Sequence, residues 1–452
     1  MKKLKITKKR RKGNIITKKR RTRNKKKKIK GGKAIGSGGF GCIFRPPLHC
    51  LNKKKETRNY NRVSKLMFKK NALDEYFEII NISKLLKHIK NKNDYFLLSG
   101  VSICRPNKFS DIDLINYNKC NNLIKHGITR YNINKYLHKL YLLQLQYGGK
   151  DLNNIFEKGK VKFNKFVKIN KILVNLLKMG IIKMNKLGVY HFDIKASNLL
   201  YNNLDNKIRL IDWGLSEHQK KNEIPENIKR RPLQYNLQFS CILFNSFFDS
   251  WYFNKLHLYN NYNDIAYKLV IHLKEQERGH FDLMEDIINK FKSKKISKEL
   301  KETYSELIEK YGGYKLTSDT SDKININSYS ILVMINHYVK IFKKYTDLKN
   351  KNFMKKKFFN EVFSKNVDIW GFLVIYYRLI YSNNNQLKKY IKNILNKYLF
   401  SGKYAAKAIN TNKLLIELNN INKLKFNENK SLFTKKSLTI IKKETKYINK
   451  LE

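Results

Sequence analysis

Proline, cysteine and acidic residues are scarce in this sequence, and long apolar runs are missing. The 452 residues include 5 Pro and 5 Cys. The two most apolar stretches, KILVNLLKMGIIKMNKLG and IWGFLVIYYRLIY, are interrupted by Lys178, Lys183 and Arg378, so neither can cross a membrane. The basic N-terminal segment runs into further charge and not into an apolar region, which excludes a secretory signal. We therefore expect an intracellular protein that does not contact a membrane.

The few cysteines carry a prediction of their own. Their number is odd and none has the spacing of a metal ligand set; they are Cys42, Cys50, Cys104, Cys120 and Cys241. Scattered cysteines of this kind are typical of proteins from reducing compartments. We expect neither a disulfide framework nor a zinc site.

Acidic residues are outnumbered, with 35 Asp and Glu against 96 Lys and Arg, and the formal net charge is +61. A charge of this size favours a polyanionic partner, such as nucleic acid or an acidic protein. The abundance of Lys, Asn, Ile, Tyr and Phe is also what an AT-rich genome would place on solvent-exposed positions. Both explanations stay open.

Four regions differ in composition. Residues 1–30 are more than half Lys and Arg, so they cannot bury enough apolar surface to fold and should form a disordered basic tail. Residues 31–147 alternate strand-like segments with one helical stretch, NALDEYFEIINISKLLKHI, and predict a small mixed sheet. Residues 148–425 are mostly helical, beginning with an apolar stripe in a long helix, and 426–452 form a basic C-terminal tail. The predicted fold class is α+β.

The first motif is the stretch AIGSGGFGCIF, with Gly36, Gly38 and Gly41 in GxGxxG spacing. Glycines in a hairpin allow backbone N–H groups to approach phosphate oxygens without interference from Cβ atoms. A dinucleotide-binding motif would need a helix after the third glycine, whereas CIFRPP is strand-like and then broken by proline. The pattern therefore favours a strand-loop-strand phosphate cover.

The second motif is a lysine inside a strand. Lys65 lies in NRVSKLMF, and a charged side chain on an apolar sheet needs a partner. In the helix that follows, Glu78 and Glu75 each begin an apolar stripe, so either carboxylate could meet Lys65. The alternative is that all three side chains are solvated on the surface.

The third motif is VYHFDIKASNLLY, in which Asp193, Lys195 and Asn198 follow a D-x-K-x-x-N pattern. Shortly afterwards the apolar run IRLIDWGLS ends on Asp212 and Gly214. In order and spacing, the glycine loop, the strand lysine, the helix glutamate and these two segments resemble the eukaryotic-type protein kinases. With a lysine two residues after the first aspartate, this segment resembles the serine/threonine-specific members of that family.

The resemblance implies a two-lobed fold, with residues 31–147 as a small β-rich N-lobe and 148–425 as a larger helical C-lobe. The segment VDIWGFLVIYY, with Asp368, resembles the aspartate-bearing helix at the base of the large lobe. This helix comes late in the chain, so about 243–360 should be a long helical insertion. The sequence of the glycine loop and the Asn- and Lys-rich composition resemble those of divergent kinases of large nucleocytoplasmic DNA viruses, of a mimivirus-like kind.

The resemblance also implies the cofactors ATP and Mg²⁺, a protein substrate and a role for each motif. Asp193 would accept the proton of the substrate hydroxyl, with Lys195 and Asn198 as further catalytic residues. Asn198 and Asp212 would hold magnesium. The residues expected to contact ATP are Ile35, Gly36, Ser37, Gly38, Gly39, Phe40, Gly41, Ile43, Lys65 and Glu78.

Two departures from the kinase pattern bear on regulation. Phe192 stands where most regulated kinases carry an arginine that pairs with a phosphorylated activation loop. Residues 217–234 contain no Ser, Thr or Tyr, so we expect activity without phosphorylation of this loop. No A-P-E sequence follows, which leaves the peptide platform undefined. The alternatives are a pseudokinase or scaffold, a kinase of small molecules or lipids, and a basic nucleic-acid-binding protein.

The basic tail supplies a first testable prediction. Deleting residues 1–30 should leave catalysis unchanged but flatten the salt dependence of nucleic-acid binding, because each Lys or Arg that contacts a phosphate releases a counterion. The measurement is the affinity for a fixed DNA duplex over a range of salt concentrations, with a Gly/Ser segment of equal length as the control. An unchanged salt dependence would favour codon bias as the origin of the charge.

Overall fold

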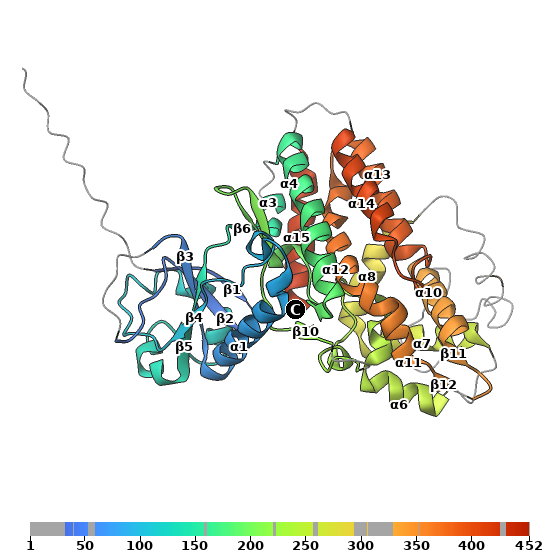
Figure 1. The fold of residues 1–452 in the computed structure, drawn as a ribbon, viewed down its shortest axis with the longest axis horizontal. Coiled ribbons are helices and arrows are strands. Elements are labelled where there is room, and N and C mark those ends of the chain that lie inside the picture. The colour runs from blue at the N-terminus through green and yellow to red at the C-terminus, as the bar shows by residue number, and fades with distance from the viewer. Residues whose placement is uncertain are drawn as a thin grey trace, which may run out of the picture.

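The structure is a computed structural model, and it describes most of the chain between residues 32 and 451. The described part excludes residues 39, 53–58, 158–160, 220–222, 256–260, 293–304, 306–328, 351 and 425–430. The expected disordered tail, 1–30, lies outside the described residues, as does much of the expected insertion. In Figure 1 the strands β1–β5 and helix α1 form one end of the molecule, and the longer helices form the other.

Residues 33–146 contain an antiparallel five-stranded sheet in the order β1-β2-β3-β5-β4. Its strands are β1 Lys33–Gly38, β2 Gly41–Arg45, β3 Arg62–Phe68, β4 Ser102–Cys104 and β5 Leu140–Gln146. Helix α1 (Lys69–Leu85) begins directly after β3 and buries residues three or four positions apart on one face: Ala72, Glu75, Ile79 and Ile82. The predicted sheet and its helix are confirmed, although the sheet is antiparallel and not mixed, and a second short helix, α2 (Asn121–Lys125), was not predicted.

Strand β5 separates two apolar cores. Leu142 belongs to a smaller core between the sheet and residues 109–137, whereas Leu143 belongs to the core that continues into the helices. Successive side chains of a strand point to opposite faces, so neighbouring leucines serve different cores. Lys65 of β3 lies opposite Leu143 and therefore points toward the helical part of the molecule.

Residues 150–451 are mostly helical, and the described helices share one continuous core. They are α3 Leu152–Glu157, α4 Phe163–Asn175, α5 Ile182–Lys186, α6 Ser246–Lys255, α7 Tyr262–Gln276, α8 Arg278–Asn289, α10 Tyr329–Tyr345, α11 Lys355–Phe358, α12 Ser364–Val374, α13 Asn385–Leu395, α14 Thr411–Asn420 and α15 Lys435–Leu451. The short strands between them are β6 Lys150–Asp151, β7 Val189–Tyr190, β8 Leu199–Asn202, β9 Lys207–Leu210, β10 Glu217–His218, β11 Thr346–Asp347 and β12 Asn352–Phe353. Helical and strand content together agree with the α+β class.

The predicted long helix runs through α4 and α5, which a π-helical turn, Leu176–Ile181, joins. Every residue of the predicted apolar stripe is buried: Phe166, Ile169, Leu173, Leu176 and Met184. Within the π turn, a Cβ at Gly180 would lie 2.9 Å from the Cβ of Tyr95. The glycine therefore allows the helix to pack closely against the chain that leads from α1 to the sheet.

The prediction that the cysteines form no disulfides is wrong. Cys42 is bonded to Cys120 and Cys50 to Cys104, and only Cys241, which is buried, is a free thiol. Each pair joins positions far apart in the sequence, with separations of 78 and 54 residues, so cysteine spacing could not reveal them. Both bonds tie the sheet to the loops around it. The cysteines therefore no longer support the inference of a reducing compartment.

The expected basic C-terminal tail, 426–452, is also corrected by the structure. Helix α15 packs against α3 and α8 and buries Ile441 and Ile448. Glu444 on this helix forms an ion pair of 2.6 Å with Lys290. The segment has apolar residues at helical spacing between its lysines, so it can bury one face while its charges stay in water.

The described residues contain neither a membrane-spanning helix nor a cluster of metal ligands. None of the helices in the described part of the chain is long and apolar enough to span a membrane. The same residues hold no cluster of three or more His, Cys, Asp or Glu side chains that could bind a metal ion by itself.

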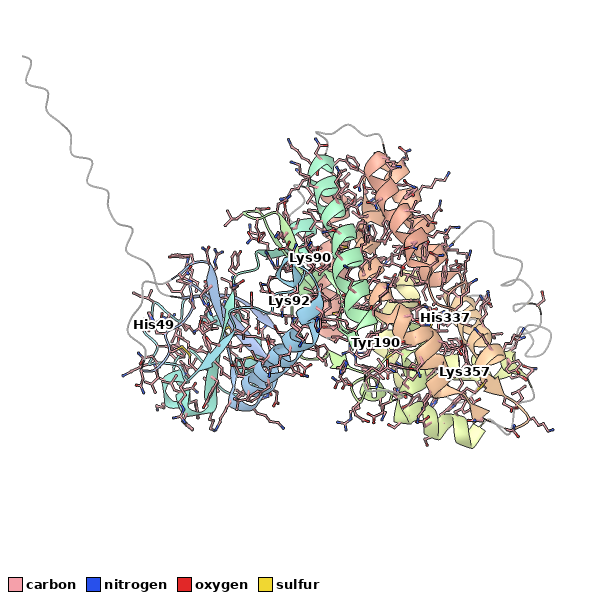
Figure 2. The ribbon with its side chains drawn as sticks, viewed as in Figure 1. His49, Lys90, Lys92, Tyr190, His337 and Lys357 are labelled. Atoms are coloured by element: carbon pink, nitrogen blue, oxygen red, sulfur yellow. A yellow bond between two sulfur atoms is a disulfide. The ribbon has the colours of Figure 1, made fainter. Side chains whose placement is uncertain are left out.

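A buried histidine leads to a prediction about acid stability. His337 on α10 lies inside the helical part (Figure 2), and neither ring nitrogen has a hydrogen-bond partner in the described structure. Burial, together with the nearby Lys340 ammonium, lowers the pKa of His337 to about 3. In the unfolded chain a histidine has a pKa of about 6.5. Between these two values the unfolded state binds a proton that the folded state does not.

The free energy of unfolding should therefore fall as the pH drops below about 6.5, by about 1.4 kcal/mol per pH unit from this residue. The His337→Phe variant should lose that share of the pH dependence and keep the edge-to-face contact with Phe239. Urea unfolding of both proteins between pH 7 and pH 5 tests this. The His88→Gln variant, at an exposed position, serves as the control. Parallel pH profiles for wild type and His337→Phe would contradict the prediction.

Candidate active site

The β8–β9 hairpin brings Asp212, which follows the apolar strand β9, to the same place as Asn198. Leu199 pairs with Leu210, and the Ile211 N–H donates to the Asn198 carbonyl oxygen at 3.0 Å. Asn198 therefore precedes β8 at the same end of the hairpin at which Asp212 follows β9. Asp212 adopts a left-handed backbone conformation, with φ 67°, which is uncommon outside glycine and is often found at functional sites.

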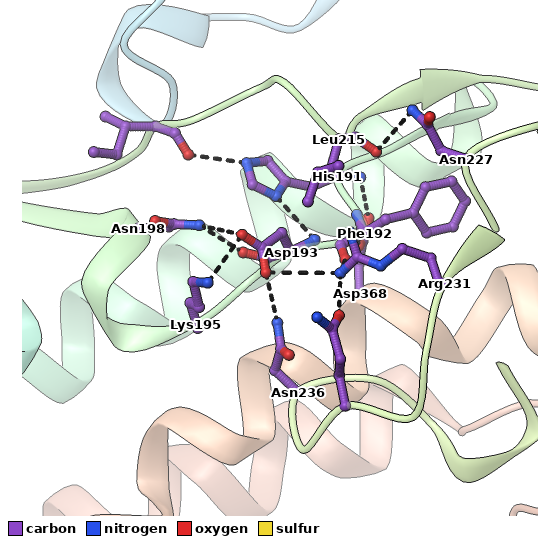
Figure 3. Close-up of polar contacts among 12 residues, drawn as sticks. His191, Phe192, Asp193, Lys195, Asn198, Leu215, Asn227, Arg231, Asn236 and Asp368 are labelled. Atoms are coloured by element: carbon purple, nitrogen blue, oxygen red, sulfur yellow. Dashed lines mark hydrogen bonds and ion pairs between the residues drawn. The ribbon is translucent and has the colours of Figure 1, made fainter. Parts of the chain in front are cut away.

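The catalytic-loop candidate, residues 191–198, is anchored by a buried carboxylate on α12. Asp368 accepts hydrogen bonds from the N–H groups of His191, at 2.9 Å, and Phe192, at 3.0 Å (Figure 3). It also accepts one from Asn185 Nδ2 at 2.7 Å. Burial raises the pKa of the Asp368 carboxyl, and these donors act in the opposite direction. The expected aspartate-bearing helix thus contacts the loop directly.

The His191 ring connects this loop to the segment that carries Asp212. Its Nε2 lies 3.0 Å from the Ile211 carbonyl oxygen, and its Nδ1 accepts a hydrogen bond from the Asp193 N–H at 3.3 Å. This network assigns the proton to Nε2. Burial lowers the pKa of His191, so the ring is neutral near pH 7. Trp213 packs edge-on against it, with ring centroids 5.0 Å apart.

Both carboxylate oxygens of Asp193 are held by donors (Figure 3). Oδ2 accepts from Asn198 Nδ2 at 2.9 Å and lies 3.2 Å from Lys195 Nζ. Oδ1 accepts from Asn236 Nδ2 at 2.9 Å and lies 3.9 Å from the Arg231 guanidinium. The three predicted catalytic residues are therefore in contact with one another, and the carboxylate has a fixed orientation.

Of the two candidate glutamates of α1, Glu75 pairs with Lys65 and Glu78 does not. Lys65 Nζ lies 2.6 Å from Glu75 Oε2, both side chains are 8% exposed, and Asp212 Oδ1 is 3.8 Å away. Burial raises the pKa of the Glu75 carboxyl, against the Lys65 ammonium, which lowers it. Because α1 begins directly after β3, Glu75 is the first carboxylate on the face that turns toward the strand.

Glu78 faces a different part of the chain. It is half-buried beside the Ser216 hydroxyl and the Glu217 carboxylate, three residues further along α1 than Glu75. Burial raises the pKa of the Glu78 carboxyl, and the neighbouring Glu217 carboxylate adds to this effect. Glu78 therefore connects α1 to the segment after Asp212 and not to Lys65.

The two glutamates of α1 allow a matched test. Glu75→Gln should lower kcat/KM for ATP about tenfold or more, because an unpaired Lys65 can turn toward Asp212. Glu78→Gln removes the same charge three residues away and should leave kcat/KM within about twofold of wild type. Steady-state kinetics with varied ATP distinguish the two. An equal loss in both variants would contradict the assignment of Glu75.

The glycine loop connects β1 and β2, and Gly39 lies outside the described residues. A Cβ at Gly36 or Gly38 would meet no atom within 4 Å. At Gly41 it would lie 2.5 Å from Met67 Cγ and 2.7 Å from the Leu66 carbonyl oxygen. Packing on β3 therefore requires only Gly41, and the space beside the other two glycines is open to a ligand.

The other predicted contact residues of this loop lie on β1, on β2 and in the turn between them. Ile35 and Phe40 are exposed, at 45% and 48%, and Ser37 is exposed as well. Ile43 on β2 lies opposite Lys65 on β3. Large exposed apolar side chains beside open glycines are compatible with a surface that covers a bound ligand.

The side chains at this site have the chemistry that a magnesium ion requires. Asp212 is 38% exposed, so its carboxylate is accessible. The side-chain hydrogen bonds of Asn198 use its NH₂ group, which leaves the side-chain oxygen Oδ1 available to a metal ion. Mg²⁺ prefers oxygen ligands and is commonly held by one or two protein side chains together with phosphates and water. A magnesium site of this type needs no larger carboxylate cluster.

Asn236 and Arg231 were not among the predicted site residues. Both belong to the segment RRPLQYNLQFS, and a distance of 43 residues separates Asn236 from Asp193. The only signal in the sequence was the overlap of this segment with the end of the hydroxyl-free stretch 217–234. No local spacing rule connects it with Asp193.

Two curated proteins are similar to this chain. A probable serine/threonine-protein kinase of fowlpox virus (strain NVSL) is 30% identical over 205 residues, which are 44% of this chain and 58% of the viral protein. This match supports a kinase-like relationship for the chain. A probable serine/threonine-protein kinase of Dictyostelium discoideum is 52% identical over 33 residues, which are 7% of this chain and 3% of that protein. The chain thus spans less than two thirds of the length of either relative, and no family model matches it.

Proposed function

We propose that this protein is an ATP-dependent protein kinase that transfers the γ-phosphate to Ser and Thr hydroxyls of proteins. The observation that carries the proposal is the meeting of four separate segments at one place. Lys65 from β3 lies 3.8 Å from Asp212 after β9, and Asp193 is held by Asn198 and by the 231–236 segment. The kinase names of the two relatives support it at the level of the family.

Phosphoryl transfer needs positioning and charge stabilisation more than covalent chemistry from the protein. Lys65, fixed by Glu75, would bind phosphate oxygens of ATP, beneath the backbone amides of the glycine loop. Asn198 and Asp212 would hold magnesium, which neutralises phosphate charge when bound. Asp193 would orient the substrate hydroxyl and accept its proton, and Lys195, 3.2 Å away, would stabilise charge on the transferred group.

The proposal includes three finer assignments. The sheet with α1 and the helical part would be the two lobes of a kinase-like fold, with about 243–360 as an insertion. The chain would be related to kinases of large DNA viruses, and it would act inside cells. A basic surface or the N-terminal region would contact a polyanion alongside the protein substrate.

The proposal also includes activity without activation-loop phosphorylation. Ser216 and Tyr235 are the two hydroxyl residues that border the stretch 217–234; Tyr235 is partly buried, and Ser216 is 2% exposed and donates to the Trp213 carbonyl oxygen. A buried, bonded hydroxyl is a poor target for a second kinase. Phosphatase-treated protein should therefore turn over at an ordinary rate.

The decisive experiment is transfer of radiolabelled γ-phosphate from Mg²⁺-ATP to a mixture of protein substrates, followed by phosphoamino-acid analysis. The expected result is phosphoserine and phosphothreonine with wild type and none with Asp193→Ala. A pseudokinase would bind ATP and transfer nothing in either case. A nucleic-acid-binding protein would be indifferent to ATP and Mg²⁺ but sensitive to salt.

A further inference from the structure

The C-terminal end of the hydroxyl-free stretch 217–234 places a buried arginine beside the catalytic loop. Arg231 is 5% exposed, whereas its neighbour Arg230 is exposed. Its Nη2 donates to the Phe192 carbonyl oxygen at 3.0 Å and to Gln234 Oε1 (Figure 3). The same group lies 3.9 Å from Asp193 Oδ1. Two consecutive arginines thus have opposite environments, and only the second contacts the site.

The burial of Arg231 is not fully compensated. Its Nε has no hydrogen-bond partner within the described part of the chain. Removing a guanidinium from water is unfavourable unless all its donors are satisfied, so stability alone does not explain its position. An incompletely satisfied buried charge next to a reactive group points to a role in the site.

Arg231 acts on the backbone of a residue in an uncommon conformation. Phe192 has a φ of 57°, which is a strained, left-handed value for a bulky side chain. Asp368 holds its N–H, Arg231 holds its carbonyl oxygen, and its ring is stacked on Tyr190 at 5.5 Å. Since the Phe192 carbonyl belongs to the peptide group that leads into Asp193, fixing it also fixes the backbone of the catalytic aspartate.

Asn236 completes the contact from the same segment. Its Nδ2 donates to Asp193 Oδ1, while Asn198 from the loop itself donates to Oδ2. Arg231 therefore fixes the backbone next to Asp193, and Asn236 fixes the rotation of its carboxylate. The segment 231–236 and the catalytic loop form one unit.

We infer that Arg231 is a positioning residue that fastens the 231–236 segment to the catalytic loop and orients Asp193, in place of a phosphate-dependent contact. In most regulated kinases the arginine is on the catalytic loop and pairs with a phosphate on the activation loop; here the two positions are exchanged. The guanidinium is on the segment, and its acceptors are the Phe192 carbonyl oxygen and Asp193 on the loop. No phosphate is needed to complete it. The inference rests on the proposed function, because it assigns a role in that reaction.

The test compares Arg231→Ala, Arg231→Lys and the control Arg230→Ala, all treated with phosphatase. Arg231→Ala should lower kcat about tenfold or more and leave the KM for ATP within about twofold, because Asp193 is misoriented while Lys65 and the glycine loop are intact. Arg231→Lys should also lose activity, since an ammonium cannot reproduce the planar fork of a guanidinium. Arg230→Ala should behave as wild type. Added methylguanidinium should restore part of kcat in Arg231→Ala only.

Each result decides the inference. If Arg231→Ala does not fold, Arg231→Lys, which keeps the charge and most of the stem, provides the answer. A kcat within about twofold of wild type in the folded variant overturns the inference, as does an equal loss in Arg230→Ala, which would mean that general charge matters. If the wild type is active and Asp193→Ala is inactive, the proposed function stands whether the inference about Arg231 holds or fails. If wild type transfers no phosphate, the proposed function fails and the inference with it.

Discussion

Asp212→Ala is expected to lower phosphoryl transfer at least about a hundredfold, because stabilisation of the transferring group by a bound metal contributes several kcal/mol. The exposed Asp212 carboxylate is the best-placed metal ligand among the predicted residues, and Lys65 cannot replace it. The fold should remain intact, since the side chain is partly in water. The measurement is kcat as a function of Mg²⁺ concentration, together with the melting temperature.

The matched control is Asp205→Ala, at the exposed turn of the same β8–β9 hairpin. Asp205 pairs with Arg209 and accepts a hydrogen bond from the Lys207 N–H, both within the hairpin, so its removal should have little effect on transfer. Near-normal activity of Asp212→Ala at every magnesium concentration would refute the metal assignment.

Asp193→Ala is expected to lower kcat by about 10² to 10⁴, the usual range for a general base. The KM for ATP should change little, because the contacts of Asp193 are with Asn198, Asn236 and Lys195, and the residues expected to bind ATP lie elsewhere in the sequence. This separates it from Asp212→Ala, whose loss should depend on the magnesium concentration. Steady-state kinetics with ATP and with the protein substrate varied in turn provide the comparison.

Asp111→Ala, at an exposed carboxylate, is a suitable control for general effects of charge. A rise in the KM for ATP with an unchanged kcat would show that Asp193 contributes to nucleotide binding and not to proton transfer.

The part of the site that is continuous in sequence could be predicted. Asp193, Lys195 and Asn198 lie in one short loop, and Asp212 ends the next hairpin, so motifs that carry the resemblance to kinases were enough to predict that they lie together. The glycine loop and β3 were predicted for the same reason. In each case the information lies within one supersecondary unit.

The choice between Glu75 and Glu78 shows where local patterns fail. The two residues are three positions apart and share one face of α1, so helical periodicity cannot separate them. The choice depends on where the helix begins. It begins at Lys69 without any loop after β3, and this brings Glu75 to Lys65.

Contacts between distant segments could not be predicted from local sequence patterns. The disulfide partners are 78 and 54 residues apart, and Asn236 approaches Asp193 only because the segment folds back. Asp368 was anticipated through the resemblance of its helix to a known one. Nothing in its own sequence neighbourhood connects it with residues 191 and 192.

The Asp368 anchor has a consequence for how the protein is made. The carboxylate that holds the Phe192 N–H follows it by 176 residues in the chain. At a synthesis rate of about 5 to 20 residues per second, the ribosome needs about 10 to 35 seconds to add them. For most of that interval the nascent chain already contains every predicted site residue, but the Asp368 carboxylate that holds the loop has not yet been made. A fragment ending near residue 242 would reproduce that unfinished state, so the site is completed only by translation of the distal part of the gene.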